Sequence, residues 1–85
     1  MKVTVLYFAR LREAVGIGSE QVELPATVAD VARLRAWLAA RGGPWAEALA
    51  AGRADRAAVD QDMAAETTEL RDGAEVAFFP PVTGG

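Results

Sequence analysis

Apolar and polar residues alternate with a period of two near the start of the chain, and this pattern predicts two β-strands. In residues 1–8 the apolar side chains at odd-numbered positions point to one side, while Leu6 and Phe8 point to the other. Residues 19–24 alternate again and end before Pro25, which closes the segment. We expect these two strands to pair with each other.

The same alternation returns at the other end of the chain. In residues 74–79, Val76 and Phe78 share one face and Phe79 lies on the opposite face. An Asp-Gly pair just before this segment is a turn signal. Residues 56–63 predict one further strand, which is weaker because it contains aspartates.

Between these strands the spacing of apolar residues becomes helical. Residues 9–15 predict a short helix, and residues 27–41 predict the main helix, with Thr27 and Asp30 resembling a capping box. Residues 44–51 predict a second short helix that begins with a proline. The main helix has an apolar stripe made of Val28, Val31, Leu34 and Leu38.

This order of elements predicts an α+β fold in which a helix packs across one face of a mixed sheet. The first and last strands are expected to be neighbours in the middle of the sheet. The length of 85 residues fits one small domain. We assign residues 1–79 to the domain and residues 80–85 to a flexible tail.

Composition narrows the classes of function. The chain is 52% hydrophobic and 25% charged, as expected of a globular protein, and its net charge of −3 favours neither nucleic acid nor an anionic membrane as a partner. Its apolar runs are shorter than the ~18 residues of a membrane span. We therefore expect a cytoplasmic protein.

The chain contains no cysteine and no histidine, so thiolate chemistry and the commonest general base are both excluded. Asp60 and Asp62 would share one face of the predicted strand from 56 to 63. Two exposed carboxylates are fewer oxygen ligands than a hard cation usually takes, so we expect no metal site and no bound cofactor.

The sequence ends in Gly84-Gly85, directly after the run Phe-Phe-Pro-Pro-Val-Thr. Glycine has no side chain, so a diglycine end can enter a narrow channel in another protein. The prolines favour an extended tail. The alternative is an end with no function of its own.

The last eight residues, 78–85, closely resemble the end of the small subunits of molybdopterin synthase, a family of ubiquitin-like sulfur carriers. Residues 5–13 are similar to the opening strand and helix of that family, and residues 36–42 match its helix in character. Residues 58–61 resemble its short third-strand motif, in which asparagine is usual where this chain has Asp60. The resemblance extends over nearly the whole chain.

The resemblance implies a β-grasp fold and a non-catalytic carrier whose chemistry occurs at Gly84-Gly85. It implies that a partner of the ubiquitin-activating type uses ATP to adenylate the carboxylate of Gly85. Sulfur transfer then gives a terminal thiocarboxylate. The large synthase subunit, expected to form a heterotetramer with this chain, would use that sulfur on a pterin precursor.

Strand alternation also predicts a surface on which such partners dock. If the valines and Phe78 face the helix, Leu6, Phe8 and Phe79 face outward on adjacent strands, with Met63 at the margin. The alternative is that the helix covers this face instead. The predicted partner-binding residues are Leu6, Phe8, Met63, Phe79, Pro80, Pro81, Val82 and Thr83.

Three other functions remain open. A carrier that supplies sulfur for thiazole synthesis would have the same chemistry but a different large partner. A ubiquitin-like modifier would be attached through Gly85 to lysines of target proteins. A structural domain with an incidental tail would carry no sulfur at all.

Overall fold

The structure is a computed structural model that describes residues 1–49 and 55–81. Its strands and helices follow one another in the order that the sequence predicts, with one additional strand. The elements are β1 (Lys2–Tyr7), α1 (Ala9–Val15), β2 (Ser19–Glu23), α2 (Val31–Ala39), α3 (Gly43–Ala48), β3 (Arg56–Val59), β4 (Asp62–Ala64) and β5 (Glu75–Phe79).

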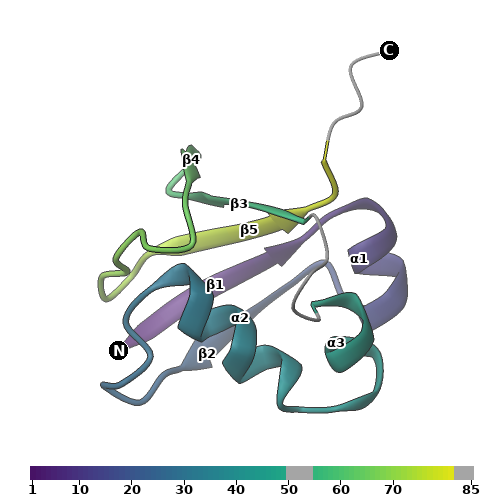
Figure 1. Ribbon diagram of the computed structural model, residues 1–85, viewed down its shortest axis with the longest axis horizontal. Coiled ribbons are helices and arrows are strands. Elements are labelled where there is room, and N and C mark those ends of the chain that lie inside the picture. Colours follow the sequence, from purple (N-terminus) through teal and green to yellow (C-terminus); the bar gives the residue numbers. More distant parts are fainter. Residues whose placement is uncertain (50–54, 82–85) are drawn as a thin grey trace.

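The strands form one mixed sheet in the order β2-β1-β5-β3-β4 (Figure 1). β1 and β5 are parallel, and the other neighbouring pairs are antiparallel. The first and last strands are therefore central neighbours, and β2 pairs with β1, as predicted. A parallel central pair requires a crossover connection, and the helical middle of the chain supplies it.

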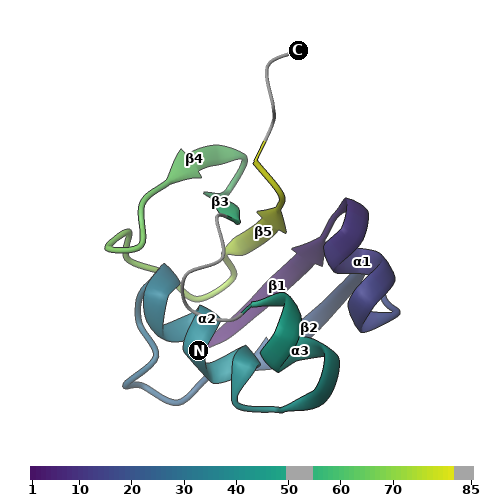
Figure 2. The same ribbon diagram turned by 45° about the vertical axis from the view of Figure 1, so that its right-hand side comes forward.

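The helices lie on one side of this sheet, as the two views show (Figures 1 and 2). Val3, Val5 and Tyr7 on β1 and Val76 and Phe78 on β5 are at most 1% exposed, so the predicted inner faces of both strands are confirmed. Val31, Leu34 and Leu38 of the predicted apolar stripe lie on α2 and are buried against them, whereas Val28 is buried but precedes the helix.

The predicted start of the main helix at Thr27 is wrong, since α2 begins four residues later. Asp30 is the N-cap, and its side chain accepts a hydrogen bond of 2.8 Å from the backbone nitrogen of Arg33. Asp30 forms a β-bridge with Glu69, and the backbone nitrogen of Val31 donates to the carbonyl of Thr68. Residues just before α2 are thus held by a distant loop.

The end of the main helix and the bounds of the short helix after it also differ from the prediction. α2 ends at Ala39, and Gly42, with a φ of 79°, is the N-cap of α3. The second short helix ends at Ala48 rather than at residue 51, and residues 50 and 51 lie outside the described residues. α3 begins at Gly43, one residue before the predicted start, so Pro44 is the second residue of its first turn.

The single strand predicted over residues 56–63 is also wrong. Asp60 and Gln61 have φ values of 50° and 72°, so they form a two-residue hairpin turn between β3 and β4. Asp60 is therefore not on a strand and does not share a strand face with Asp62. Its Oδ1 accepts a hydrogen bond of 2.9 Å from the backbone nitrogen of Glu75, a role that asparagine could also fill.

A polar cluster connects α2, α3 and the inner face of the sheet. Tyr7 and Arg41 each donate a hydrogen bond of 2.8 Å to Glu20, and the indole of Trp45 donates one of 3.1 Å to the hydroxyl of Tyr7. Burial alone would raise the pKa of Glu20, but the hydrogen bonds from Arg41 and Tyr7 outweigh it and lower the pKa. Burial and the bond to Glu20 raise the pKa of Tyr7. The cluster therefore stabilises the fold with Glu20 ionised.

We predict that Glu20→Gln lowers the free energy of unfolding at pH 7 by about 1–2 kcal/mol, because it weakens two charge-assisted hydrogen bonds. A lowered pKa in the folded state means that this contribution is present above the unfolded pKa and is lost as pH falls through the folded pKa. In denaturant unfolding from pH 7 down to pH 3, the free energy of unfolding should therefore fall less in the variant than in the unmodified protein. Glu23→Gln, on an exposed residue of the same strand, is the matched control.

Candidate functional site

The face of the sheet opposite the helices carries a continuous row of apolar residues. Leu6 pairs with Ala77, Ala77 with Ala58, and Ala58 with Met63, so the row crosses β1, β5, β3 and β4 in register. Residues directly opposite each other point to the same side of a sheet, so all four share this face. We call it the outer face.

Two aromatic residues extend the outer face toward the end of β5. Phe79 lies two residues after Ala77 and is half-buried, and Phe8 follows β1 and is 47% exposed. The backbone nitrogen of Phe8 donates to the carbonyl of Phe78, which holds it beside β5. The outer face is then made of Leu6, Phe8, Ala58, Met63, Ala77 and Phe79.

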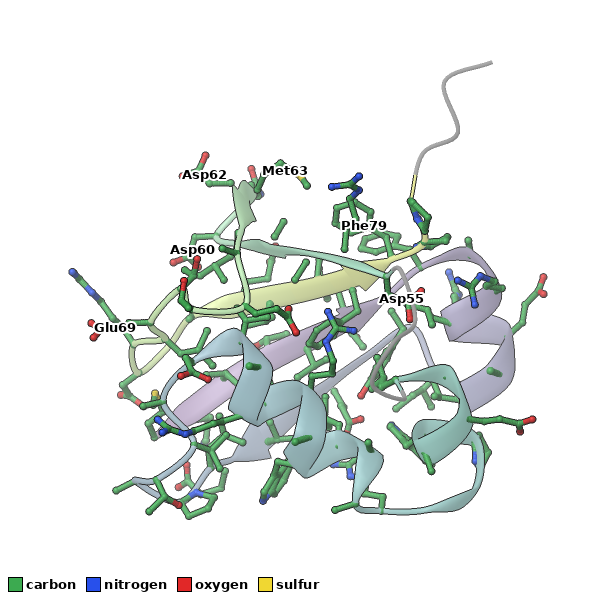
Figure 3. All side chains as sticks on the ribbon, viewed as in Figure 1. Asp55, Asp60, Asp62, Met63, Glu69 and Phe79 are labelled. Carbon is green, nitrogen blue, oxygen red and sulfur yellow. The ribbon has the colours of Figure 1, made fainter. Side chains whose placement is uncertain are left out.

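The orientation predicted for these side chains agrees with the structure. Met63, which is 64% exposed, and Phe79 lie on the side of the sheet away from α2 and α3 (Figure 3). Leu6 is half-buried on the same face. The alternative in which the helix covers this face is excluded, because the helices pack on the side of Val5 and Phe78.

The outer face ends where the predicted tail begins. β5 finishes at Phe79, and Pro80 and Pro81 follow it, both half-buried. Val82, Thr83, Gly84 and Gly85 lie outside the described residues, so the predicted roles of this segment and the domain boundary at residue 79 stay predictions. A partner seated on the outer face would contact the chain next to its last described residue.

Three residues of this face, Arg56, Ala58 and Ala77, were not singled out from the sequence as candidate site residues. Ala58 and Ala77 are each 9% exposed. Because their side chains are small, the middle of the face projects little from the sheet. Arg56 pairs with Phe79 in the β3–β5 ladder, which places a guanidinium on the same face. Alternation along β3 would have revealed both Arg56 and Ala58 if the pairing of β3 with β5 had been known.

A cluster of charges lies on the other side of the sheet and also escaped the sequence analysis. Arg35 is only 8% exposed, forms two hydrogen bonds with Glu66 at 2.9 and 3.1 Å, and lies 5.2 Å from the ring centre of Phe78. The side chain of Asp55 is buried and accepts a bond of 2.8 Å from Arg10. Helical spacing could have revealed Arg35, because it lies four residues after Val31 on the buried stripe.

These charges attach the start of β3 to α1 and α2. Among the described residues, Asp55 Oδ2 and Arg35 Nη1 find no hydrogen-bond partner. Within residues 1–49 and 55–81, no group of three potential metal ligands comes together.

A groove of about 280 Å³ beside α1 and α3 is lined by Arg10, Leu11, Ala14, Glu47 and Ala48, and none of these is a strong nucleophile.

In the part of the chain that the structure describes, no helix has the length and apolar character needed to cross a membrane. The described part of the chain presents an apolar sheet face that includes Arg56 and, on the other side of the sheet, a network of partly buried ion pairs. A surface of this kind suits recognition of another protein.

Known proteins resemble this chain over almost all of its length. The family model described as ThiS family matches residues 5–85. The molybdopterin synthase sulfur carrier subunit of Escherichia coli is 46% identical over 83 residues, covering 98% of this chain and 99% of that protein. The protein of the same name from Haemophilus influenzae is 39% identical with the same coverage.

Solved structures have the same architecture. SAMP1, a small archaeal modifier protein from Haloferax volcanii, superposes with a TM-score of 0.79 at 25% identity, with both chains fully covered. A chain from a complex of subunits 1 and 2 of the molybdopterin-converting factor of Helicobacter pylori gives a TM-score of 0.67 at 26% identity, again with full coverage of both chains. These likenesses confirm the predicted ubiquitin-like β-grasp fold.

Proposed function

Since the chain belongs to the ThiS family, we propose that it is the sulfur carrier subunit of a molybdopterin synthase. The observation that carries this proposal is the likeness, at 46% identity over 98% of the chain, to a protein with that role. The eight-residue end resembles the working end of such carriers, and the outer face supplies a surface for partners. We place this chemistry in the cytoplasm, where ATP is available.

The sulfur is carried on the α-carboxyl group of Gly85. The chain has no cysteine, so a thiol cannot hold the sulfur. A free α-carboxylate has a pKa near ~3.5, is ionised at neutral pH and is a poor electrophile. A partner enzyme therefore joins it to the α-phosphate of ATP and releases pyrophosphate. Hydrosulfide, or an equivalent donor of sulfur at the sulfide level, then attacks the acyl carbon, AMP leaves, and a thiocarboxylate remains.

The outer face docks on the partners while the tail enters their active sites. Residues 80–85 span at most about 20 Å when extended, at ~3.3–3.6 Å per residue. Pro80 and Pro81 restrict the start of this segment, which reduces the conformational entropy lost on insertion. Gly84 directly precedes the residue with the reacting carbon, and the absence of a side chain at Gly84 and Gly85 suits a narrow channel.

Two proteins are the proposed partners. One is an adenylating enzyme of the ubiquitin-activating type, and the other is the large synthase subunit, with which this chain forms a heterotetramer. The Helicobacter pylori relative, whose structure is a complex of subunits 1 and 2, supports the second pairing. The carrier itself binds no cofactor and supplies no catalytic side chain.

The test of this function is a measurement of sulfur on the terminus. Intact mass spectrometry of the protein from cells that make its partners should show a species heavier by about 16 Da, from replacement of one oxygen by sulfur. The thiocarboxylated chain and its large subunit should then convert the pterin precursor. A terminus that stays a carboxylate in the presence of both partners would contradict the proposal. Co-purification with a thiazole-forming enzyme instead would assign the carrier to that pathway.

One observation favours a second function, that of a protein modifier. The small archaeal modifier protein superposes with a TM-score of 0.79, against 0.67 for the chain from the Helicobacter pylori complex. A modifier would leave Gly85 in an isopeptide bond with a lysine of another protein. Proteolysis and mass spectrometry of whole-cell protein distinguish the two functions, since only a modifier leaves a C-terminal fragment joined through Gly85 to target lysines, and cleavage after Arg71 leaves residues 72–85 as that fragment.

We predict that the purified chain alone neither adenylates its own terminus nor consumes the precursor. The sequence has no histidine or cysteine, and the buried carboxylate of Asp55 is paired with Arg10. ATP–pyrophosphate exchange should stay at background with the carrier alone and appear when the adenylating partner is added. Exchange by the carrier alone, at a rate that survives repeated purification, would contradict the prediction.

A further inference from the structure

Arg56 is a cation on an otherwise apolar part of the outer face. It is exposed and pairs in register with Phe79, while the β3–β4 ladder ends one residue later at the Ala57–Ala64 pair. Within residues 1–49 and 55–81 its guanidinium has no hydrogen-bond or ion-pair partner. By contrast, other arginines of this chain hold a carboxylate, as Arg10 does with Asp55 and Arg41 does with Glu20.

The position of Arg56 makes its charge important for docking. In the free chain water solvates the guanidinium at little cost. A partner that covers Phe79 must also cover the residue beside it in the ladder, which removes that water. A desolvated cation without an acceptor is strongly unfavourable, and a carboxylate whose two oxygens accept parallel N–H bonds from one edge of the planar guanidinium offsets the cost.

We propose that Arg56 is a specificity-determining residue that pairs with an aspartate or glutamate of the large subunit, at the mouth of the channel that receives the tail. This inference rests on the proposed function and adds the chemistry of the partner surface. It requires an acidic side chain there and disfavours partners that present a lysine or arginine at the same place.

The pair also orients the tail. Phe79 is the last residue of β5 and directly precedes Pro80, so a contact at Arg56 lies at the root of the segment that must enter the channel. The rest of the outer face is apolar. Apolar contacts fix the relative orientation of two proteins poorly, because the hydrophobic effect is non-directional. A bidentate ion pair beside Phe79 supplies the missing direction.

The experiment measures the Kd of the complex between the chain and its large subunit for a set of charge variants. Arg56→Glu should raise the Kd by at least on the order of tenfold, because it places like charges together. Arg56→Ala should weaken binding less, and Arg56→Lys should weaken it least. Arg71→Glu makes the same charge change at an exposed position in the turn before β5, and it should leave the Kd within about twofold.

A charge swap tests the pairing directly. Aspartates and glutamates around the channel mouth of the large subunit are changed singly to arginine, and one of them should restore binding to Arg56→Glu while weakening the unmodified chain. Circular dichroism and thermal unfolding confirm that each variant is folded. With thiocarboxylated carriers, Arg56→Glu should raise the KM for carrier and leave the kcat nearly unchanged.

The outcomes separate this inference from the proposed function. If Arg56→Glu binds as well as Arg71→Glu while Phe79→Ala binds more weakly, the outer face docks but Arg56 is not its specificity residue, and the inference is overturned. If neither Arg56→Glu nor Phe79→Ala weakens binding, the docking face itself is wrong. Weak binding of Arg56→Glu that no charge swap restores would overturn the pairing with a carboxylate.

Discussion

Deletion of Gly85 should abolish sulfur delivery while leaving the fold and the docking of the carrier nearly unchanged. On the proposed mechanism the reacting atom is the terminal acyl carbon. Removal of one residue moves that carbon by about 3.5 Å along an extended chain. Reaction requires near-attack geometry, in which an error of about 1 Å already costs on the order of 100-fold in rate. The loss should therefore exceed that factor.

The fold should not respond, because the hydrophobic core is built from residues between Val3 and Phe78. The measurement is conversion of the pterin precursor by the large subunit with a chemically thiocarboxylated carrier, together with a separate measurement of Kd. Addition of one glycine after Gly85 is the complementary variant. It displaces the terminal carbon by the same distance in the other direction, so it should be equally inactive. Gly84→Val keeps the length of the tail but adds a branched side chain. A loss of sulfur delivery in this variant would therefore show that the channel is too narrow for a side chain at position 84.

A shortened or lengthened carrier that still delivers sulfur at a rate near that of the full chain would contradict the role of the terminus. The sulfur-carrier function would then fail, even if the outer face proved to bind the large subunit. Loss of docking together with loss of delivery would show instead that the last residues contribute to binding.

Phe78→Ala and Phe79→Ala should have opposite effects although the two residues are adjacent. Phe78 is 0% exposed and packs in the core, so its truncation should lower the free energy of unfolding by about 3–5 kcal/mol. For a domain of this size that is a fall in Tm on the order of 15 °C. Phe79 lies on the outer face, so Phe79→Ala should leave Tm nearly unchanged and weaken docking by ~1–3 kcal/mol.

Thermal unfolding and the Kd for the large subunit, measured on both variants, check this pair. Val76→Ala and Phe8→Ala repeat the comparison on other residues, with Val76 in the core and Phe8 on the outer face. A stable Phe78→Ala that docks weakly, beside an unstable Phe79→Ala that docks normally, would show that the two faces of the sheet are assigned the wrong way round.

The sidedness of β1 and β5 could be predicted from the sequence because alternation is a local property. A strand turns each successive side chain to the opposite face, so Val5 and Leu6 are separated whatever the rest of the chain does. Burial of Val5 at 0% and exposure of Phe8 at 47% follow from that geometry. The helical periods of α1 and of the stripe on α2 were predictable for the same reason.

The errors occurred where distant residues compete with local signals. Thr27 and Asp30 are both good N-caps, and local rules do not choose between them. Asp30 is the cap because residues on either side of it bond to the loop that contains Glu69. Asp60 adopts a left-handed φ, and two hydrogen bonds to the backbone of Glu75, 15 residues away, hold the hairpin that divides the predicted third strand.

The sequence by itself determined the faces of the individual strands, the absence of thiol and imidazole chemistry, and the diglycine end, because each depends on residue identity and local geometry. The order of elements already led us to expect that β1 pairs with β2 and with β5, but only the tertiary structure decided that β3 lies between β5 and β4. That arrangement buries Arg35 against Phe78 on one side of the sheet and places Arg56 beside Phe79 on the other. Strand pairing depends on contacts between segments far apart in the chain, and local patterns carry no record of it.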